Sequence, residues 1–169
     1  NINKIATLRN ARGGNYPNVV QVATDCERFG AQGITVHPRP DERHITQQDV
    51  LDLKKVVRTE YNIEGYPNDR FMDLVLDVKP TQATLVPDPP GVLTSNAGWD
   101  TKANQAMLTD LAITFKEHDI RSAIFVDTEL QNIEYAAKCG VDRIELYTGP
   151  FAEGYATNPQ KSIENYVRA

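Results

Sequence analysis

Two of the three histidines in this 169-residue chain lie close together, at His37 and His44, with two arginines between them. Imidazole groups exchange protons near neutral pH, and guanidinium groups bind anions through paired hydrogen bonds. The segment 37–44 directly follows the apolar run 33–36, which predicts a loop leaving the C-terminal end of a buried strand. In α/β folds, ligands bind at the carboxyl ends of the strands. We therefore expect His37, Arg39 and His44 to belong to a site that binds an anion and transfers protons.

Two glutamates, Glu64 and Glu145, lie inside apolar runs that predict strands. Burying a carboxylate is costly unless the group is paired or functional, and the loss of solvent raises its pKa. A glutamate with a raised pKa can act as a general base near pH 7. We predict that both glutamates are catalytic. The alternative is a structural ion pair inside the fold with a cation such as Lys4.

Two further segments carry groups that bind phosphate or sugar hydroxyls. Arg9 and Arg12 precede a pair of glycines, and a guanidinium fork beside closely approaching backbone amides suits a phosphate. Thr94 begins a run of small polar residues after the apolar segment 83–87. Taken alone, each segment is more often an ordinary polar loop than a binding site.

The elements that must position these residues alternate along the chain. Near-continuous apolar runs, typical of parallel strands covered on both faces, predict strands at 1–5, 33–37, 62–66, 83–87, 122–127 and 143–148. Helical periodicity and capping residues predict helices at 19–29, 46–59, 69–78, 101–119, 130–139 and 159–168. This alternation is typical of an α/β fold with a parallel sheet.

Six βα units fit either a doubly wound open sheet or part of a (β/α)₈ TIM barrel. A barrel takes about 250 residues, or about 200 at the small end, and units of this size would reach eight in roughly 225 residues. We expect one domain over residues 1–169, an incomplete (β/α)₈ barrel of about six βα units whose C-terminal units are missing. A complete six-stranded sheet is the alternative.

The composition predicts an ordinary soluble protein, with 40% hydrophobic and 24% charged residues. A net charge of −5 argues against nucleic acid as a partner, because a phosphate backbone requires a basic surface. No apolar stretch approaches the roughly 20 residues of a membrane span, and the first residues lack the apolar region of a signal peptide. We therefore expect a cytoplasmic protein with no membrane partner.

Four segments of the chain resemble the pyridoxine 5′-phosphate synthase family of vitamin B6 biosynthesis. They are NINKIATLRNARG at 1–13, GITVHPRPDERHI at 33–45, LVP at 85–87 and RIELYT at 143–148. The resemblance implies a (β/α)₈ barrel assembled as a homo-octamer. It also implies the condensation of 3-amino-1-hydroxyacetone 1-phosphate with 1-deoxy-D-xylulose 5-phosphate to give pyridoxine 5′-phosphate, phosphate and water. The implied partners are these phosphorylated small molecules, without a metal or an organic cofactor.

The resemblance also implies roles for individual residues. His37 matches a general acid and base of the family, and Glu64 matches a second general base. Glu145 matches a carboxylate that stabilises charge during the reaction. Asn1 and Arg12 match groups that hold the aminoketone phosphate, and of these residues only Asn1 lacks a separate signal in the sequence.

The deoxyxylulose phosphate would be held by Arg39, His44 and Thr94. Many family members carry Asp-His where this chain has Asn3 and Lys4, a pair that contacts the same substrate. Lys4 supplies a cation there, but proton transfer at this position must differ. The family also continues for roughly two more βα units, on the expected barrel size. Those units carry another catalytic histidine and glycine-rich phosphate contacts.

Two other functions compete with this one. The first is another barrel enzyme acting on phosphosugars, an aldolase or an epimerase, for which Lys4 is the one Schiff-base candidate near a strand end. The second is a non-catalytic relative that binds phosphosugars, which the Asn3-Lys4 pair favours.

Overall fold

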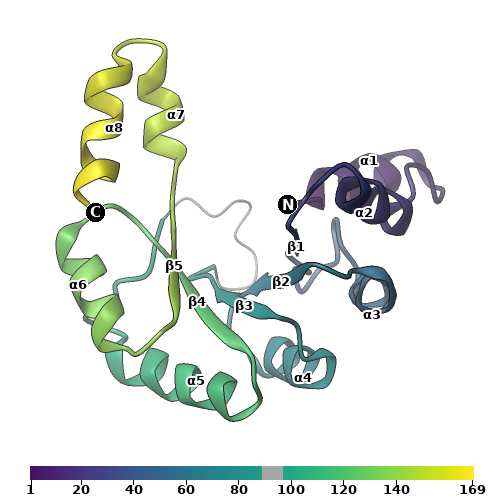
Figure 1. Ribbon diagram of the computed structural model, residues 1–169, viewed down its shortest axis with the longest axis horizontal. Helices are drawn as coiled ribbons and strands as arrows, with labels where there is room; N and C mark the ends of the chain where they lie inside the picture. The colour runs from purple at the N-terminus through teal and green to yellow at the C-terminus, as the bar shows by residue number, and fades with distance from the viewer. Residues whose placement is uncertain (89–96) are drawn as a thin grey trace.

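Five parallel strands form one sheet, in which neighbours along the chain are also neighbours in space (Figure 1). The computed structural model describes residues 1–88 and 97–169. The strands are β1 (Gly33–Val36), β2 (Glu60–Gly65), β3 (Gln82–Leu85), β4 (Arg121–Val126) and β5 (Arg143–Leu146). This order, with a helix between successive strands, is that of a (β/α) barrel and not of a doubly wound sheet.

Six of the eight helices in the described part of the chain lie at predicted positions, and several begin at a side-chain cap. They are α1 (Asn3–Arg12), α2 (Val19–Arg28), α3 (Gln47–Val56), α4 (Asp69–Val78), α5 (Gln105–Glu117), α6 (Leu130–Lys138), α7 (Gly149–Tyr155) and α8 (Pro159–Arg168). Thr46 and Asp49 form a reciprocal capping box at the start of α3, as their spacing predicts. In the described part of the chain, no helix is both long and apolar enough to cross a bilayer.

The prediction of a strand at 1–5 is wrong, because α1 begins at Asn3. Ile2 and Ala6 are both buried, and this spacing of four residues places them on one helical face. The amide of Ile2 still donates to the carbonyl of Thr35 over 3.0 Å, so the first two residues lie against the edge of β1. The described sheet therefore has five strands and not six.

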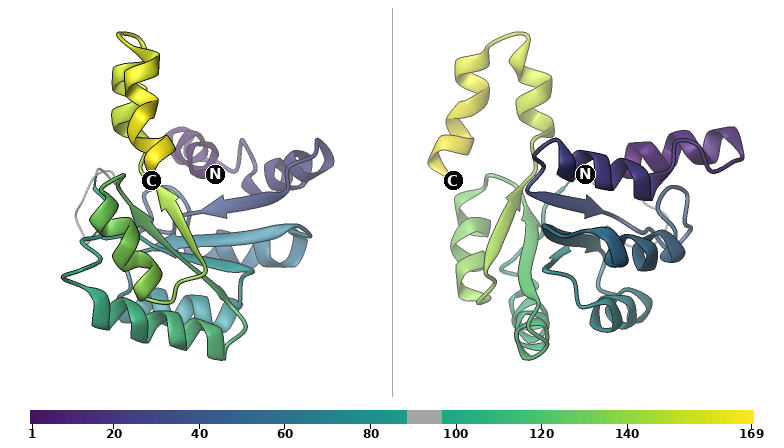
Figure 2. Two further views of the ribbon diagram at one scale, coloured as in Figure 1. Left: turned by 60° about the vertical axis from the view of Figure 1, so that its left-hand side comes forward. Right: turned by 45° about the vertical axis from the view of Figure 1, so that its right-hand side comes forward.

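Helices α7 and α8 lie side by side and extend away from the sheet in both views of Figure 2. Helix α7 is not among the helices predicted from the sequence. The hydroxyl of Tyr166 in α8 donates to the carbonyl of Tyr147 over 2.7 Å and accepts from the amide of Phe151 over 3.3 Å. This hydroxyl ties the pair of helices to the end of β5.

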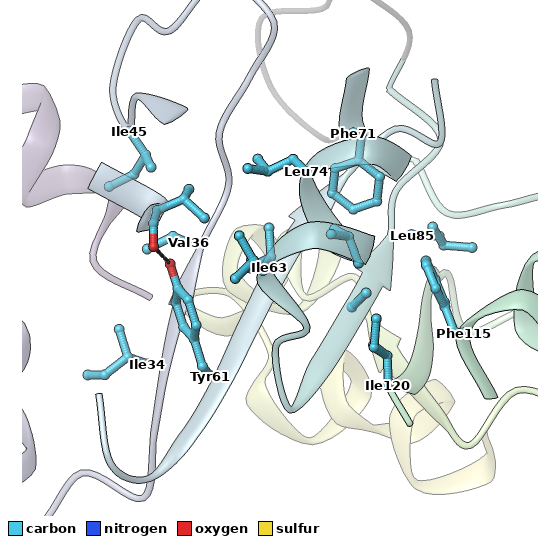
Figure 3. Packing of buried hydrophobic residues seen from close by; sticks show 14 of the residues in the cluster. Ile34, Val36, Ile45, Tyr61, Ile63, Phe71, Leu74, Leu85, Phe115 and Ile120 are labelled. Carbon is cyan, nitrogen blue, oxygen red and sulfur yellow. Dashed lines mark hydrogen bonds between the residues drawn. The ribbon is translucent and has the colours of Figure 1, made fainter. Parts of the chain in front are cut away.

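Alternate side chains of the strands lie on opposite faces of the sheet. The outer face carries apolar residues that pack under α3 to α6 and form the core shown in Figure 3. The strands contribute Ile34, Val36, Tyr61, Ile63 and Leu85 to this core, and Phe115 of α5 and Ile120 pack against them. The hydroxyl of Tyr61 donates to the carbonyl of Val50 over 3.1 Å, so its polar atom remains satisfied inside this core.

The inner face of the sheet is mainly polar, and its polar side chains are arranged in layers. In the middle layer, the side-chain nitrogen of Asn62 donates to the hydroxyl of Thr35 over 3.3 Å, and its side-chain oxygen accepts from the hydroxyl of Thr84 over 2.9 Å. At the amino ends of the strands, Arg121 forms an ion pair with Glu60. The third layer lies at the carboxyl ends of the strands. Because strand side chains alternate, this layer receives Glu64, two residues after Asn62.

The segment around Gly98 is pressed against the ends of β3 and β4. Trp99 donates from its amide to the carbonyl of Phe125 and from its indole to the carbonyl of Leu85, each over 2.9 Å. A Cβ atom at Gly98 would lie 2.2 Å from the amide nitrogen of Asp127. No side chain can fit there without a shift of the backbone.

We therefore expect Gly98→Ala to lower the free energy of unfolding by about 1–3 kcal/mol. Urea unfolding followed by the fluorescence of Trp99, the single tryptophan of the chain, measures this loss. Gly14→Ala is the matched control, because a Cβ atom at Gly14 would meet nothing within 4 Å. Equal unfolding midpoints for the two variants would contradict the prediction.

Candidate active site

A cavity of about 270 Å³ opens at the carboxyl ends of the strands. Its lining includes the three predicted catalytic residues, His37, Glu64 and Glu145. His37 directly follows β1, Glu64 lies near the end of β2, and Glu145 lies in β5. The sheet therefore brings together three groups that are separated by up to 108 positions in the sequence (145 − 37).

The same lining includes most of the predicted binding residues: Asn1, Asn3, Lys4, Arg39 and His44. Arg12 is exposed in the last turn of α1 and is not part of the lining that the structure describes. Thr94 lies outside the described residues.

The imidazole of His37 and the carboxyl group of Glu64 lie side by side and are both buried. The Nδ1 atom of His37 is 3.9 Å from Oε2 of Glu64. The side-chain amide of Asn1 donates to the same oxygen over 3.3 Å. The side-chain oxygen of Asn3 accepts from the backbone amide of His37 over 2.9 Å, which fixes the strand end that carries the imidazole.

Burial, together with the nearby carboxyl group of Glu145, raises the pKa of Glu64 to about 8. Burial also raises the pKa of Glu145 above its ordinary value. Loss of solvent disfavours the charged form of each group, and two carboxylates facing one cavity repel each other. At pH 7 Glu64 is therefore mainly protonated, and it ionises as the pH rises through 8.

Burial and the guanidinium of Arg39 lower the pKa of His37 to about 4. The carboxylate of Asp88 opposes this shift but does not overcome it. His37 is therefore a neutral imidazole at pH 7, beside a carboxyl group that can hold a proton. Two neighbouring groups whose pKa values are pushed apart are the arrangement that acid–base catalysis requires.

The cationic side of the cavity is formed by Lys4 and Arg39. The guanidinium of Arg39 is buried, and it donates to the carboxylate of Asp88 over 3.2 Å. Burial, followed by the charges of Arg39 and Arg43, lowers the pKa of His44, so this imidazole is also neutral at pH 7. The arrangement can bind an anionic group beside the proton-transfer pair. Among the described residues, no three His, Cys, Asp or Glu side chains gather as a metal site.

Three residues of the lining were not predicted from the sequence: Thr7, Val86 and Phe125. Thr7 follows the segment 1–5 that was predicted as a strand, whereas it lies in α1, one helical turn after Asn3, and its hydroxyl donates to the carbonyl of Asn3 over 3.1 Å. The alternation of strand side chains was the available signal for the other two. Phe125, for instance, is directly opposite Glu145 in the sheet.

A parallel sheet with helices outside it and acid–base groups at the carboxyl ends of its strands defines an enzyme of the (β/α)-barrel class. Solved structures agree on this fold. A flavocytochrome b2 variant with sulfite bound superposes with a TM-score of 0.62 at 13% identity, over 97% of this chain and 45% of its own. A mandelate oxidase variant with benzoyl-formic acid gives a TM-score of 0.63 at 9% identity, over 88% of this chain and 50% of its own.

The sequence comparisons identify the family. The model of the family described as "Pyridoxal phosphate biosynthesis protein PdxJ" matches residues 1–169. Proteins named pyridoxine 5′-phosphate synthase are 62% identical in Phocaeicola vulgatus, 63% in Parabacteroides distasonis and 60% in Bacteroides thetaiotaomicron. Each alignment covers 100% of this chain and 71% of the relative. The chain therefore belongs to the pyridoxine 5′-phosphate synthase family of vitamin B6 biosynthesis, as its motifs predict.

Proposed function

We propose that this cavity condenses 3-amino-1-hydroxyacetone 1-phosphate with 1-deoxy-D-xylulose 5-phosphate, giving pyridoxine 5′-phosphate, phosphate and water. The observation that carries the proposal is the buried pair of His37 and Glu64, a neutral imidazole 3.9 Å from a carboxyl group, in a cavity that also holds cations. Imine formation, loss of phosphate, dehydration and ring closure each move a proton, and each needs an acid or a base at the reacting atom.

His37 serves as a general acid and base in this proposal, because its neutral ring can accept a proton and return it. Glu64 serves as the second base once it has ionised. Glu145 faces the same cavity and stabilises the positive charge of an iminium intermediate through its carboxylate. Holding both substrates in one cavity contributes to the rate as well, because their alignment removes part of the entropic barrier.

We assign the deoxyxylulose phosphate to the side of the cavity that carries Asn3, Lys4, Arg39 and His44. The support is the cluster of cationic and neutral donors there, which matches a phosphate. Thr94, which lies outside the described residues, is assigned to the same substrate on the family resemblance alone. Asn1, through its contact with Glu64, is assigned to the aminoketone. Arg12 is assigned to the aminoketone phosphate on the family resemblance alone.

The proposal extends to assembly and location: a homo-octamer in the cytoplasm, acting on small phosphorylated substrates without a cofactor. Light scattering of the full-length protein at several concentrations tests the assembly. A mass of one or two subunits would refute an octamer.

The reaction is tested by incubating the full-length protein with both substrates and measuring pyridoxine 5′-phosphate by mass spectrometry and phosphate release by colorimetry. We expect equal amounts of both products, and neither when one substrate is omitted. Binding of both substrates without product would support the non-catalytic alternative. Borohydride trapping of a ketose phosphate on Lys4 would support an aldolase.

The pH dependence of kcat/KM tests the coupling between the two glutamates. If Glu64 acts as a base, kcat/KM rises with pH and levels off above about 8, the pKa of its carboxyl group in the free enzyme. Glu145→Gln removes a neighbouring negative charge, so it lowers the pKa of Glu64 and moves this limb to lower pH. The wild-type protein and Glu145→Gln are assayed with the same substrates, whose own ionisation affects both profiles equally. The difference between the two profiles therefore reports ionisation of the enzyme. An unchanged or higher midpoint would contradict the coupling.

A further inference from the structure

Arg9 is held by contacts that keep its guanidinium from serving as a phosphate ligand. It forms a two-pronged ion pair with the carboxylate of Asp49, over 2.5 and 2.8 Å, and both side chains are nearly buried at 11% and 13% exposure. The same guanidinium donates to the backbone carbonyl of His44 over 3.1 Å. The prediction that Arg9 binds a phosphate is therefore not supported.

Asn10, the next residue of α1, adds to this connection. Its side-chain amide donates to the carbonyl of His44 over 2.9 Å and to that of Arg43 over 3.0 Å. Two neighbouring residues of α1 thus bind the backbone of His44 through hydrogen bonds. Helix α1 also places Asn3 and Lys4 in the lining of the cavity, so these hydrogen bonds connect two parts of the lining, α1 and the segment that contains His44.

Asp49 fixes the other side of the same backbone. Its carboxylate accepts from the amide of Thr46 over 2.8 Å and from the hydroxyl of Thr46 over 2.9 Å. Thr46 is two residues from His44 and is the N-cap residue of α3. Arg9, Asp49 and the capping box therefore lock the segment 44–46 between α1 and α3.

The ring of His44 depends on this backbone for its position. Its Nδ1 atom is buried and, within the described residues, has no hydrogen-bond partner. No side-chain contact through that atom orients the imidazole, although the imidazole lines the cavity. A small shift of the 44–46 backbone would move the ring directly.

We infer that Arg9 and Asp49 are positioning residues, which set the geometry of His44 toward the deoxyxylulose phosphate. The inference rests on the proposed function in its choice of substrate. Arginine is needed at position 9 because only its planar fork can hold a carboxylate with two bonds and reach a carbonyl as well. Lysine keeps the charge but offers one nitrogen.

The test is Arg9→Lys in the full-length protein. We expect the KM for 1-deoxy-D-xylulose 5-phosphate to rise on the order of tenfold, as for the loss of one charged hydrogen bond. The KM for the aminoketone phosphate should stay unchanged. Arg121→Lys is the matched control, since Arg121 pairs with Glu60 at the opposite ends of the strands. We expect this control to leave both KM values unchanged.

Two further measurements separate positioning from a general loss of structure. In a His44→Ala background, Arg9→Lys should add nothing to the KM for the deoxyxylulose phosphate, because the ring it positions is absent. In the nitrogen–proton NMR spectrum of the histidine side chains, Arg9→Lys should broaden or split the His44 signal and leave His118 unchanged.

Equal rises of both KM values, or a full additional rise in the His44→Ala background, would overturn the inference. An unchanged His44 signal would overturn it as well. If the wild-type protein condenses nothing, the proposed function fails, whereas the NMR comparison still decides whether Arg9 positions His44.

Discussion

Replacing Glu64 with glutamine lowers kcat by about 10²–10⁴-fold and changes each KM by less than about threefold, the pattern expected when a general base is removed. Glutamine keeps the shape of the side chain and can still contact Asn1. It has no ionised form, so it cannot take the proton that the carboxylate accepts. Steady-state kinetics with each substrate varied in turn measures both parameters.

Glu60→Gln is the matched control, because it makes the same chemical change in the same strand at the other end of the inner face. Glu60 forms ion pairs with Arg121 and Arg143 and faces away from the cavity end of the sheet. We expect this variant to lose some stability and to keep its kcat. A kcat near the wild-type value for Glu64→Gln would remove Glu64 from the catalytic set.

The second large effect is expected from His37→Gln, which also lowers kcat by about 10²–10⁴-fold. The backbone amide of His37, which donates to Asn3, is unaffected by the change. The substitution removes only a ring that is neutral at pH 7 and poised to accept a proton. Because the pKa of His37 is lowered to about 4, the loss should be similar at every pH from 6 to 9.

His118→Gln provides the comparison for this variant. His118 is half-buried at the C-terminal end of α5, and its Nδ1 atom lies 2.8 Å from the carbonyl oxygen of Thr114. It has no place in the cavity, so kcat should be unchanged. Equal losses in the two histidine variants would mean that the effect of His37→Gln is structural and not catalytic.

The sequence predicted most elements because local signals specify them. The Thr46–Asp49 capping box and the apolar face of α4 depend on residues within one or two turns. The prediction of a strand at 1–5 was wrong because the local signal there is too weak. Five residues carry too little periodicity to separate a strand from a helix start, and the burial of Ile2 and Ala6 decided between them.

The polarity of the inner face was also hidden in the sequence. Polar residues such as Asn62 and Thr84 alternate with buried apolar ones, and the expectation of near-continuous apolar strands overlooked them. Their hydrogen bonds join different strands, so only the assembled sheet shows that they satisfy one another.

By itself, the sequence determined the residue types of the proposed site, their places at or near strand ends and the family. Glu64 and Glu145 could be named because an apolar strand rarely holds a carboxylate without a function, and His37 because it directly follows such a strand. The tertiary structure decided what these groups can do. The neutral imidazole of His37 and the raised pKa of Glu64 come from burial and from neighbours on other strands. The sequence could not show the role of Arg9 either, because its partner Asp49 lies 40 positions away. Only the fold shows that the guanidinium of Arg9 is paired with the carboxylate of Asp49.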